Sequence, residues 1–262
     1  MVRVISALTI LPVVIGTIWF LPAWATFVLA QMVLLLSFRE YMVLARGFGA
    51  APYRLVTLVV MVATVTAAPQ DLMGLILMVG MLALGVTSLM TARSGGQVLL
   101  DVSASVLPLL YIGVPLGTFV ALRISVGREA VLLLLATIVV SDTAQYYGGR
   151  WLGRTPLAPV VSPKKTREGA LFGVGAGMAF MLACAPRVFG SSPVFDRVVL
   201  GAVIVVLGIA GDLFESQLKR GAGLKDSSSL IPGHGGILDR LDSLFFAAPA
   251  FYLYLRLVGE FE

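Results

Sequence analysis

The sequence predicts an all-α integral membrane protein, a single polytopic membrane domain of about nine transmembrane helices. Of its 262 residues, 58% are apolar and only 13% are charged, which is about half the charged share of a typical soluble domain. A soluble chain of this length could not cover so many apolar side chains with polar surface. The apolar runs are also long enough to cross a bilayer as helices, and they lack the alternation of barrel strands.

Nine apolar runs qualify as spans, because a helical crossing needs about 17–25 residues. In chain order they cover residues 4–21, 23–38, 55–70, 72–92, 102–122, 129–148, 169–186, 196–216 and 243–259. The first run follows Arg3 and is followed by Ala23-Trp24-Ala25, which imitates a signal-peptide cleavage site. Apolar sequence resumes at once, so we expect a helical hairpin that turns at Leu21-Pro22-Ala23.

The distribution of basic residues predicts the orientation of the spans. If the N-terminus is cytoplasmic, 14 of the 19 Lys and Arg residues lie on the cytoplasmic side and 5 lie outside. This bias favours a cytoplasmic N-terminus and an external C-terminus. The two longest polar loops, 149–168 and 217–242, then share the cytoplasmic side.

The scarcity of cysteine and histidine excludes several kinds of site. Cys184 is the single cysteine and His234 the single histidine, so the chain can form neither an internal disulfide nor a zinc site built from these residues. Basic repeats interleaved with aromatic residues are absent, and we therefore expect no nucleic-acid partner.

Carboxylates at the ends of apolar runs are the first sign of a site. Asp142 and Asp212 each follow a long apolar stretch, where an ionised carboxylate is costly unless it faces a cavity or has a partner. Helical spacing places Asp212, Ser216 and Lys219 in one polar stripe. Asp239 and Asp242 open the last span in a similar way. These stripes predict a polar cavity on the cytoplasmic side, although helix-end salt bridges at the headgroup boundary would leave the same pattern.

A glycine-rich loop at 231–236, Ile-Pro-Gly-His-Gly-Gly, is the second sign. Glycines let the backbone approach a ligand and direct its N–H groups at an anion. Nearby cations suit phosphate, whereas the nearby carboxylates would repel phosphate unless a metal ion lay between them. The mixture predicts phosphate together with a hard divalent cation, magnesium, and leaves open whether a second cation binds. The loop lacks the lysine and spacing of a P-loop.

The residues around this loop resemble a known signature. The stretch from Ser216 to Asp242 reads Ser216-x-Leu218-Lys219-Arg220-x4-Lys225-Asp226-x4-Ile231-Pro232-Gly233-His234-Gly235-Gly236-Ile237-x-Asp239-Arg240-Leu241-Asp242. This string is similar to the signature of the phosphatidate cytidylyltransferases. The upstream Gly211-Asp212-Leu213-x-Glu215-Ser216 and Ser162-Pro163-Lys164-Lys165-Thr166-x-Glu168-Gly169 resemble the same family. The matched motifs cover about a quarter of the chain.

The resemblance implies that CTP and phosphatidic acid react to give CDP-diacylglycerol and pyrophosphate, with magnesium. Spans of about 1–128 would precede a catalytic part at about 129–262. The implied catalytic residues are Asp212, Asp239, Lys219, Lys225 and Ser216. The implied metal ligands are Asp212 and Asp239 first, then Asp142, Asp226 and Asp242. The implied substrate contacts are Ser162, Lys164, Lys165, Thr166, Arg220, His234, Gly235, Gly236 and Arg240.

Two alternatives remain open at the level of sequence. A related lipid nucleotidyltransferase or polyprenol kinase would share these features, because apolar spans do not encode the identity of the lipid. An ion-coupled transporter would also carry carboxylates near the membrane, but here they cluster at one face beside a glycine-rich loop. We expect a multi-pass protein of the inner, cytoplasmic membrane, with its site facing the cytoplasm and with membrane lipid as a partner; a homodimer is compatible with the sequence.

Overall fold

The computed structural model describes residues 12–91, 95–190, 192–228 and 235–258. The chain forms two compact units. Unit 1 comprises residues 1–124 and 218–240, and unit 2 comprises residues 125–217 and 241–262. Each unit is described separately.

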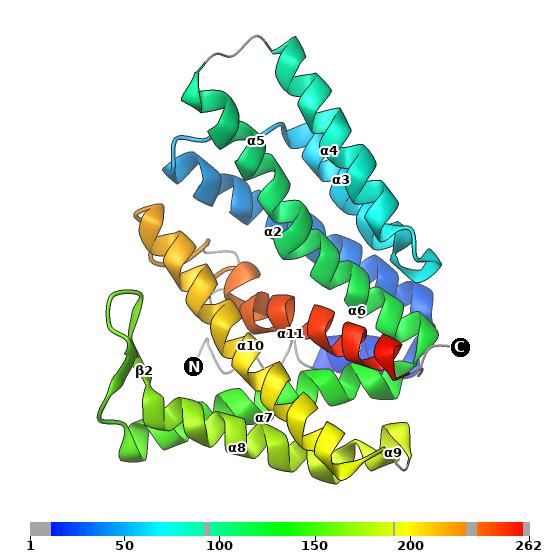
Figure 1. The fold of residues 1–262 in the computed structure, drawn as a ribbon, viewed down its shortest axis with the longest axis vertical. Helices are drawn as coiled ribbons and strands as arrows, with labels where there is room; N and C mark the ends of the chain where they lie inside the picture. The colour runs from blue at the N-terminus through cyan, green and yellow to red at the C-terminus, as the bar shows by residue number, and fades with distance from the viewer. Residues whose placement is uncertain (1–11, 92–94, 191, 229–234, 259–262) are drawn as a thin grey trace. The chain divides into compact units, whose positions relative to one another are not determined.

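Unit 1 is a bundle of apolar helices. It contains α2 (Ala23–Gly47), α3 (Arg54–Ala67), the 3-10 turn η1 (Ala68–Gln70), α4 (Met73–Met90), α5 (Gly96–Pro108), the π-helical turn η2 (Leu109–Gly113) and α6 (Val114–Ser125). Its core includes the fully buried side chains of Leu34, Met61, Ile112 and Leu122. Helices α3 and α4 pack side by side (Figure 1), and they approach closely because Gly80 faces Val60.

Unit 2 combines long helices with one short hairpin. It contains α7 (Arg128–Leu152), strands β1 (Pro156–Ala158) and β2 (Ser162–Thr166), α8 (Arg167–Cys184), α9 (Pro186–Phe189), most of α10 (Val194–Gly221) and most of α11 (Leu238–Leu257). Helix α7 packs along α8 (Figure 1). Glycine permits this approach, because a Cβ atom on Gly173 would lie 2.3 Å from Cγ of Gln145.

The predicted spans coincide with helices wherever the structure describes them. Residues 12–20 are helical, and residues 1–11 of the first predicted span lie outside the described residues. Several helices are longer than predicted: α2 continues to Gly47, α7 to Leu152 and α10 to Gly221. The fifth predicted span is a continuous helical stretch from α5 through η2 to α6. The all-α prediction is therefore confirmed.

Six helical segments of the described residues are long and apolar enough to cross a membrane. They are Ala23–Gly47, Met73–Met90, Gly96–Ser125, Arg128–Leu152, Arg167–Phe189 and Val194–Gly221. Arg54–Gln70 is a shorter apolar helix, and α11 is not among the six. The chain is a multi-pass membrane protein, and the count of nine spans stays a prediction.

The loop predicted at 149–168 contains the antiparallel β1–β2 hairpin, which the sequence did not indicate. Thr166 caps the following helix by accepting a hydrogen bond from the Gly169 amide at 3.1 Å. Glu168 accepts hydrogen bonds from the Arg154 and Thr155 amides at 3.1 and 3.2 Å, which closes the base of the hairpin. These contacts hold β2 in a defined place at the start of α8.

Candidate functional site

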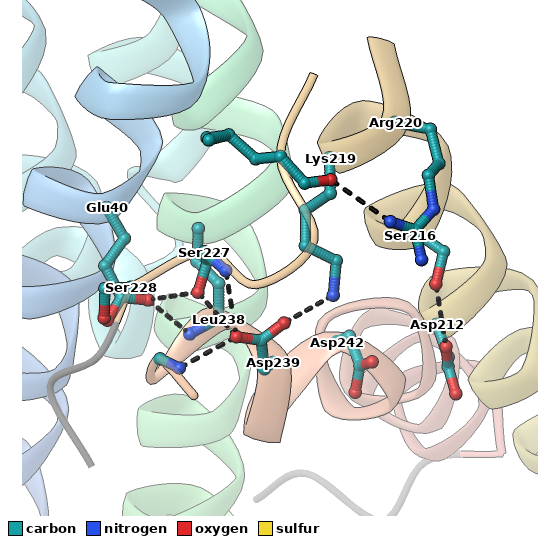
Figure 2. Close-up of polar contacts among 12 residues, drawn as sticks. Glu40, Asp212, Ser216, Lys219, Arg220, Ser227, Ser228, Leu238, Asp239 and Asp242 are labelled. Carbon is teal, nitrogen blue, oxygen red and sulfur yellow. Dashed lines mark hydrogen bonds and ion pairs between the residues drawn. The ribbon is translucent and has the colours of Figure 1, made fainter. Parts of the chain in front are cut away.

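Asp239, in the first turn of α11, is the centre of a buried polar cluster in unit 1 (Figure 2). Its Oδ2 accepts hydrogen bonds from the Ser227 amide at 3.1 Å, the Ser227 hydroxyl at 2.9 Å and the Gly236 amide at 2.8 Å. Its Oδ1 forms an ion pair with Nζ of Lys219, which lies near the end of α10. We call Lys219, Ser227, Gly236 and Asp239 the Asp239 cluster.

The surroundings of Asp239 keep it ionised. Burial by itself would raise the pKa of this carboxyl group, but the hydrogen bonds from Lys219, Gly236 and Ser227 and the positive charge of Lys219 outweigh that effect. The pKa of Asp239 is lowered to about 2. At neutral pH, the Asp239 cluster therefore contains an ionised carboxylate that is paired with the Lys219 side chain.

The two described glycines of the glycine-rich loop pack closely against the side chains of Asp239 and Ser227. Gly235 has a φ of +80°, and a Cβ atom there would lie 2.6 Å from Oδ2 of Asp239. A Cβ atom on Gly236 would lie 2.0 Å from the Ser227 hydroxyl oxygen. The absence of side chains at Gly235 and Gly236 thus allows the loop backbone to pack against Asp239 and Ser227.

A second polar cluster, in unit 2, gathers three of the predicted acidic residues around a lysine. Nζ of Lys165, on β2, lies 2.5 Å from Oδ2 of Asp212, on α10. Asp142 and Asp242 each interact electrostatically with both Lys165 and Asp212. We call Asp142, Lys165, Asp212 and Asp242 the Asp212 cluster.

Hydrogen bonds orient the members of the Asp212 cluster. Gln145 donates to Oδ1 of Asp142 at 3.0 Å, and the Ser216 hydroxyl lies 3.4 Å from Oδ1 of Asp212 (Figure 2). The Ser243 amide donates to Oδ1 of Asp242 at 2.7 Å. Three carboxylates thus gather near one another with one ammonium group among them, an excess of negative charge.

Other predicted residues lie outside both clusters. Lys225, Asp226, Arg220 and Arg240 are exposed, as is Lys164 on β2. The Arg220 guanidinium donates to the Leu224 carbonyl at 3.3 Å. Ser162 pairs with Ala158 in the hairpin. His234 lies outside the described residues.

Glu40 is a member of the site's surroundings that the sequence analysis missed. Its side chain, on α2, contacts Ser227 and Ser228 and the start of α11 (Figure 2). A signal was available, because Glu40 is the sole acidic residue of this 25-residue, mainly apolar helix. The corresponding predicted span ends at residue 38, so Glu40 falls outside it.

The oxygen ligands of the Asp212 cluster are of the kind that magnesium prefers. Across the described part of the chain, no three His, Cys, Asp or Glu side chains already stand in the arrangement of a metal site. The Lys165 ammonium instead lies against Asp212. The chemistry of the donors fits a hard cation, and the crowding of like charges among Asp142, Asp212 and Asp242 is the feature that such a cation would relieve.

Comparison with known proteins agrees with these features. A model of the cytidylyltransferase family matches residues 1–258. A phosphatidate cytidylyltransferase of Synechocystis is 32% identical over 269 residues, covering 91% of this chain and 90% of the relative. A Helicobacter pylori protein of the same name is 41% identical over 147 residues, which is 56% of this chain and only 54% of the relative. An Aquifex aeolicus protein of the same name is 42% identical over 124 residues, which is 47% of this chain and 46% of the relative. The chain belongs to the cytidylyltransferase family.

Proposed function

We propose that this protein is a phosphatidate cytidylyltransferase, which makes CDP-diacylglycerol and pyrophosphate from CTP and phosphatidic acid in phospholipid biosynthesis. The observation that carries the proposal is the similarity to the Synechocystis enzyme, which extends over nine-tenths of both chains. The two charged clusters support it, because a reaction between two polyanions needs fixed positive charge and carboxylates that can hold a cation.

The proposed reaction is a nucleotidyl transfer. A phosphate oxygen of phosphatidic acid attacks the α-phosphorus of CTP and forms the new P–O bond. The bond between the α-phosphorus and the oxygen bridging to the β-phosphate breaks, and pyrophosphate leaves with that electron pair. Catalysis of such a step rests on positioning and charge neutralisation, and it needs no histidine base.

Within unit 1, we assign phosphate binding to Lys219, whose ammonium group is held in place by Asp239. A positioned cation can contact a phosphate oxygen without reorganising during the reaction, which makes it more effective than a mobile surface lysine. The exposed side chains of Lys225, Arg220 and Arg240 are suited to attracting the anionic substrates from solution. Ser216, in unit 2, is assigned as a hydrogen-bond donor to phosphate oxygens of the substrates.

We further propose that Asp142, Asp212 and Asp242 are the residues that hold magnesium. Their carboxylates lie within mutual electrostatic range, whereas both oxygens of Asp239 already accept hydrogen bonds from the protein and Asp226 is exposed. Bound magnesium would neutralise negative charge on the phosphates of CTP. The Lys165 ammonium, 2.5 Å from Asp212, would balance the remaining carboxylate charge.

The proposed location is the inner, cytoplasmic membrane, with the N-terminus and the loops at 149–168 and 217–242 on the cytoplasmic side. The support is the bias of basic residues and the cytosolic origin of CTP. In a Cys184→Ser background, single cysteines at Ser228 and Ser191 should react with an impermeant thiol reagent from opposite sides of the membrane. Reaction of both from the same side would contradict this topology.

The activity is tested with purified protein, radiolabelled CTP and phosphatidic acid, with and without magnesium. We expect labelled CDP-diacylglycerol and one equivalent of pyrophosphate, and we expect turnover to require the metal. An archaeal-type ether lipid phosphate and a polyprenol serve as competing acceptors. Preferential turnover of either acceptor, or none of the three, would overturn the proposal.

A further inference from the structure

Glu40 carries a buried carboxylate that forms hydrogen bonds with described residues of a distant part of the sequence. Its side chain lies within α2 and is only 4% exposed. Oε1 accepts hydrogen bonds from the Ser228 hydroxyl at 2.6 Å and the Ile237 amide at 2.9 Å. Oε2 accepts from the Leu238 amide at 2.9 Å and lies 2.9 Å from the Ser227 hydroxyl, whose single proton it shares with Oδ2 of Asp239. A charge this deeply buried is tolerated because two backbone amides and the Ser228 hydroxyl donate to it and the Ser227 hydroxyl adds a shared proton.

These four hydrogen bonds tie together two separate stretches of chain. Ser227 and Ser228 precede the glycine-rich loop, and Ile237 and Leu238 follow it at the start of α11. The first N–H groups of a helix have no partner within the helix, and a carboxylate placed there also interacts favourably with the helix dipole. Glu40 therefore caps α11 from another helix.

The helix that carries Glu40 is itself firmly anchored in unit 1. Leu34 and Leu44 on α2 are essentially fully buried, and the Tyr41 hydroxyl donates a hydrogen bond to the Ala104 carbonyl of α5 at 2.9 Å. The packing of α2 therefore fixes the position of the Glu40 carboxylate. A glycine-rich segment has few side chains of its own with which to define its position, so an external anchor of this kind sets where it lies.

The anchor connects directly with the Asp239 cluster. The Ser227 hydroxyl lies 2.9 Å from both Glu40 Oε2 and Asp239 Oδ2, and so lies between the two carboxylates. A Cβ atom on Gly236 would lie 2.3 Å from Glu40 Oε2, which shows how tightly the backbone packs against this side chain. Asp239 directly follows Leu238, whose amide donates a hydrogen bond to Glu40.

We infer that Glu40 is a positioning residue: it acts through Ser227 and the first turn of α11 to place the Asp239–Lys219 pair. Its activity readout rests on the proposed cytidylyltransferase function, and its structural readout does not. Loss of Glu40 should leave the phosphate-binding charges present but misplaced, and a displacement of about 1 Å can lower a rate about 100-fold.

The test compares Glu40→Gln and Glu40→Asp with Glu129→Gln. Glutamine keeps the shape but replaces one acceptor by a donor that faces donors, whereas aspartate keeps the charge on a shorter side chain. Glu129 is a matched control, because its side chain is 46% exposed and pairs with its chain neighbour Arg128 at 3.0 Å.

Hydrogen–deuterium exchange of the peptide containing residues 235–240 supplies the structural readout. Glu40→Gln should speed exchange at Ile237 and Leu238 by about 10-fold or more, because a hydrogen bond to a charged group accounts for about 1.5–3 kcal/mol. Glu129→Gln should leave this exchange unchanged. Wild-type exchange in Glu40→Gln would overturn the inference even if the protein proved to have another enzymatic activity.

Steady-state kinetics supply the second readout. In Glu40→Gln we expect kcat to fall about 10–100-fold with KM for CTP within about threefold, and Glu40→Asp should recover part of kcat. A fall in kcat that only matches the loss of folded protein would reduce Glu40 to a structural role and overturn the inference. Absence of turnover in the wild type would instead contradict the proposed function.

If Glu40→Gln fails to fold, Ser228→Ala provides a second test, because it removes one of the hydrogen bonds to Glu40. It should shift both readouts in the same direction as Glu40→Gln. Wild-type values in both readouts would overturn the inference.

Discussion

Lys219 and Asp239, twenty residues apart in sequence, form an ion pair whose side chains are only 11% and 8% exposed. The sequence motif suggested them separately, one as a phosphate-binding cation and the other as a metal ligand. In the structure each is the other's partner, so neither can be removed without leaving a buried charge. Their contributions to stability and to activity are therefore coupled.

The first prediction concerns this pair. Lys219→Ala or Asp239→Asn should each lower the free energy of unfolding by about 3–5 kcal/mol, because breaking a buried pair strands one charge. The double variant should lose less than the sum of the two. Denaturant unfolding in detergent provides the double-mutant cycle. The exposed Arg128–Glu129 pair is the control and should show little coupling. Additive losses at Lys219 and Asp239 would show that they do not interact.

The second prediction separates two adjacent lysines. Lys165 pairs with Asp212, whereas Lys164 is exposed, as expected for neighbouring residues on a strand. Lys165→Ala should therefore reduce kcat at least about 10-fold, the effect of losing one hydrogen bond between charged groups. Lys164→Ala should act mainly on KM, and less at high salt. Equal effects of the two substitutions on kcat would contradict the distinction.

The third prediction addresses the metal. Magnesium together with CTP should raise the melting temperature of the wild type, because a ligand that binds only the folded state stabilises it. Asp212→Asn should lose this stabilisation and at least about 100-fold of turnover, since asparagine keeps an oxygen ligand but removes the charge. Asp196→Asn, at the other end of α10, is the matched control and should behave like the wild type. A normal magnesium response in Asp212→Asn would exclude Asp212 as a ligand.

The fourth prediction concerns glycine. Gly236→Ala should abolish most activity and lower the melting temperature, because the new Cβ atom would lie 2.0 Å from the Ser227 hydroxyl oxygen and 2.3 Å from Glu40. Gly74→Ala is the control: no atom lies within 4 Å of its Cβ position in α4. Alanine is also the better helix former, so this control should be neutral or slightly stabilising. An active, stable Gly236→Ala protein would contradict the described packing.

The sequence by itself determined the class of the protein and most of its helices. Apolar composition and run length are local properties, and a chain in a bilayer must satisfy its backbone hydrogen bonds within each segment. That is why the predicted spans reappear as helices in the described residues. Helix ends were predicted less well, because polar residues such as Arg39 and Glu40 can continue a helix that packing protects. The β1–β2 hairpin was missed because it has neither a long alternating pattern nor an apolar face.

Only the tertiary structure decided how the polar residues are partnered. The sequence placed Asp142, Asp212, Asp239 and Asp242 in one group of candidates, but their partners depend on contacts between segments distant in the chain. Folding joined Asp212 to Lys165 and Asp239 to Lys219. It also brought Glu40 to Leu238, 198 residues away. Motif spacing records which side chains are present, whereas the neighbour that neutralises a buried charge is set by three-dimensional packing.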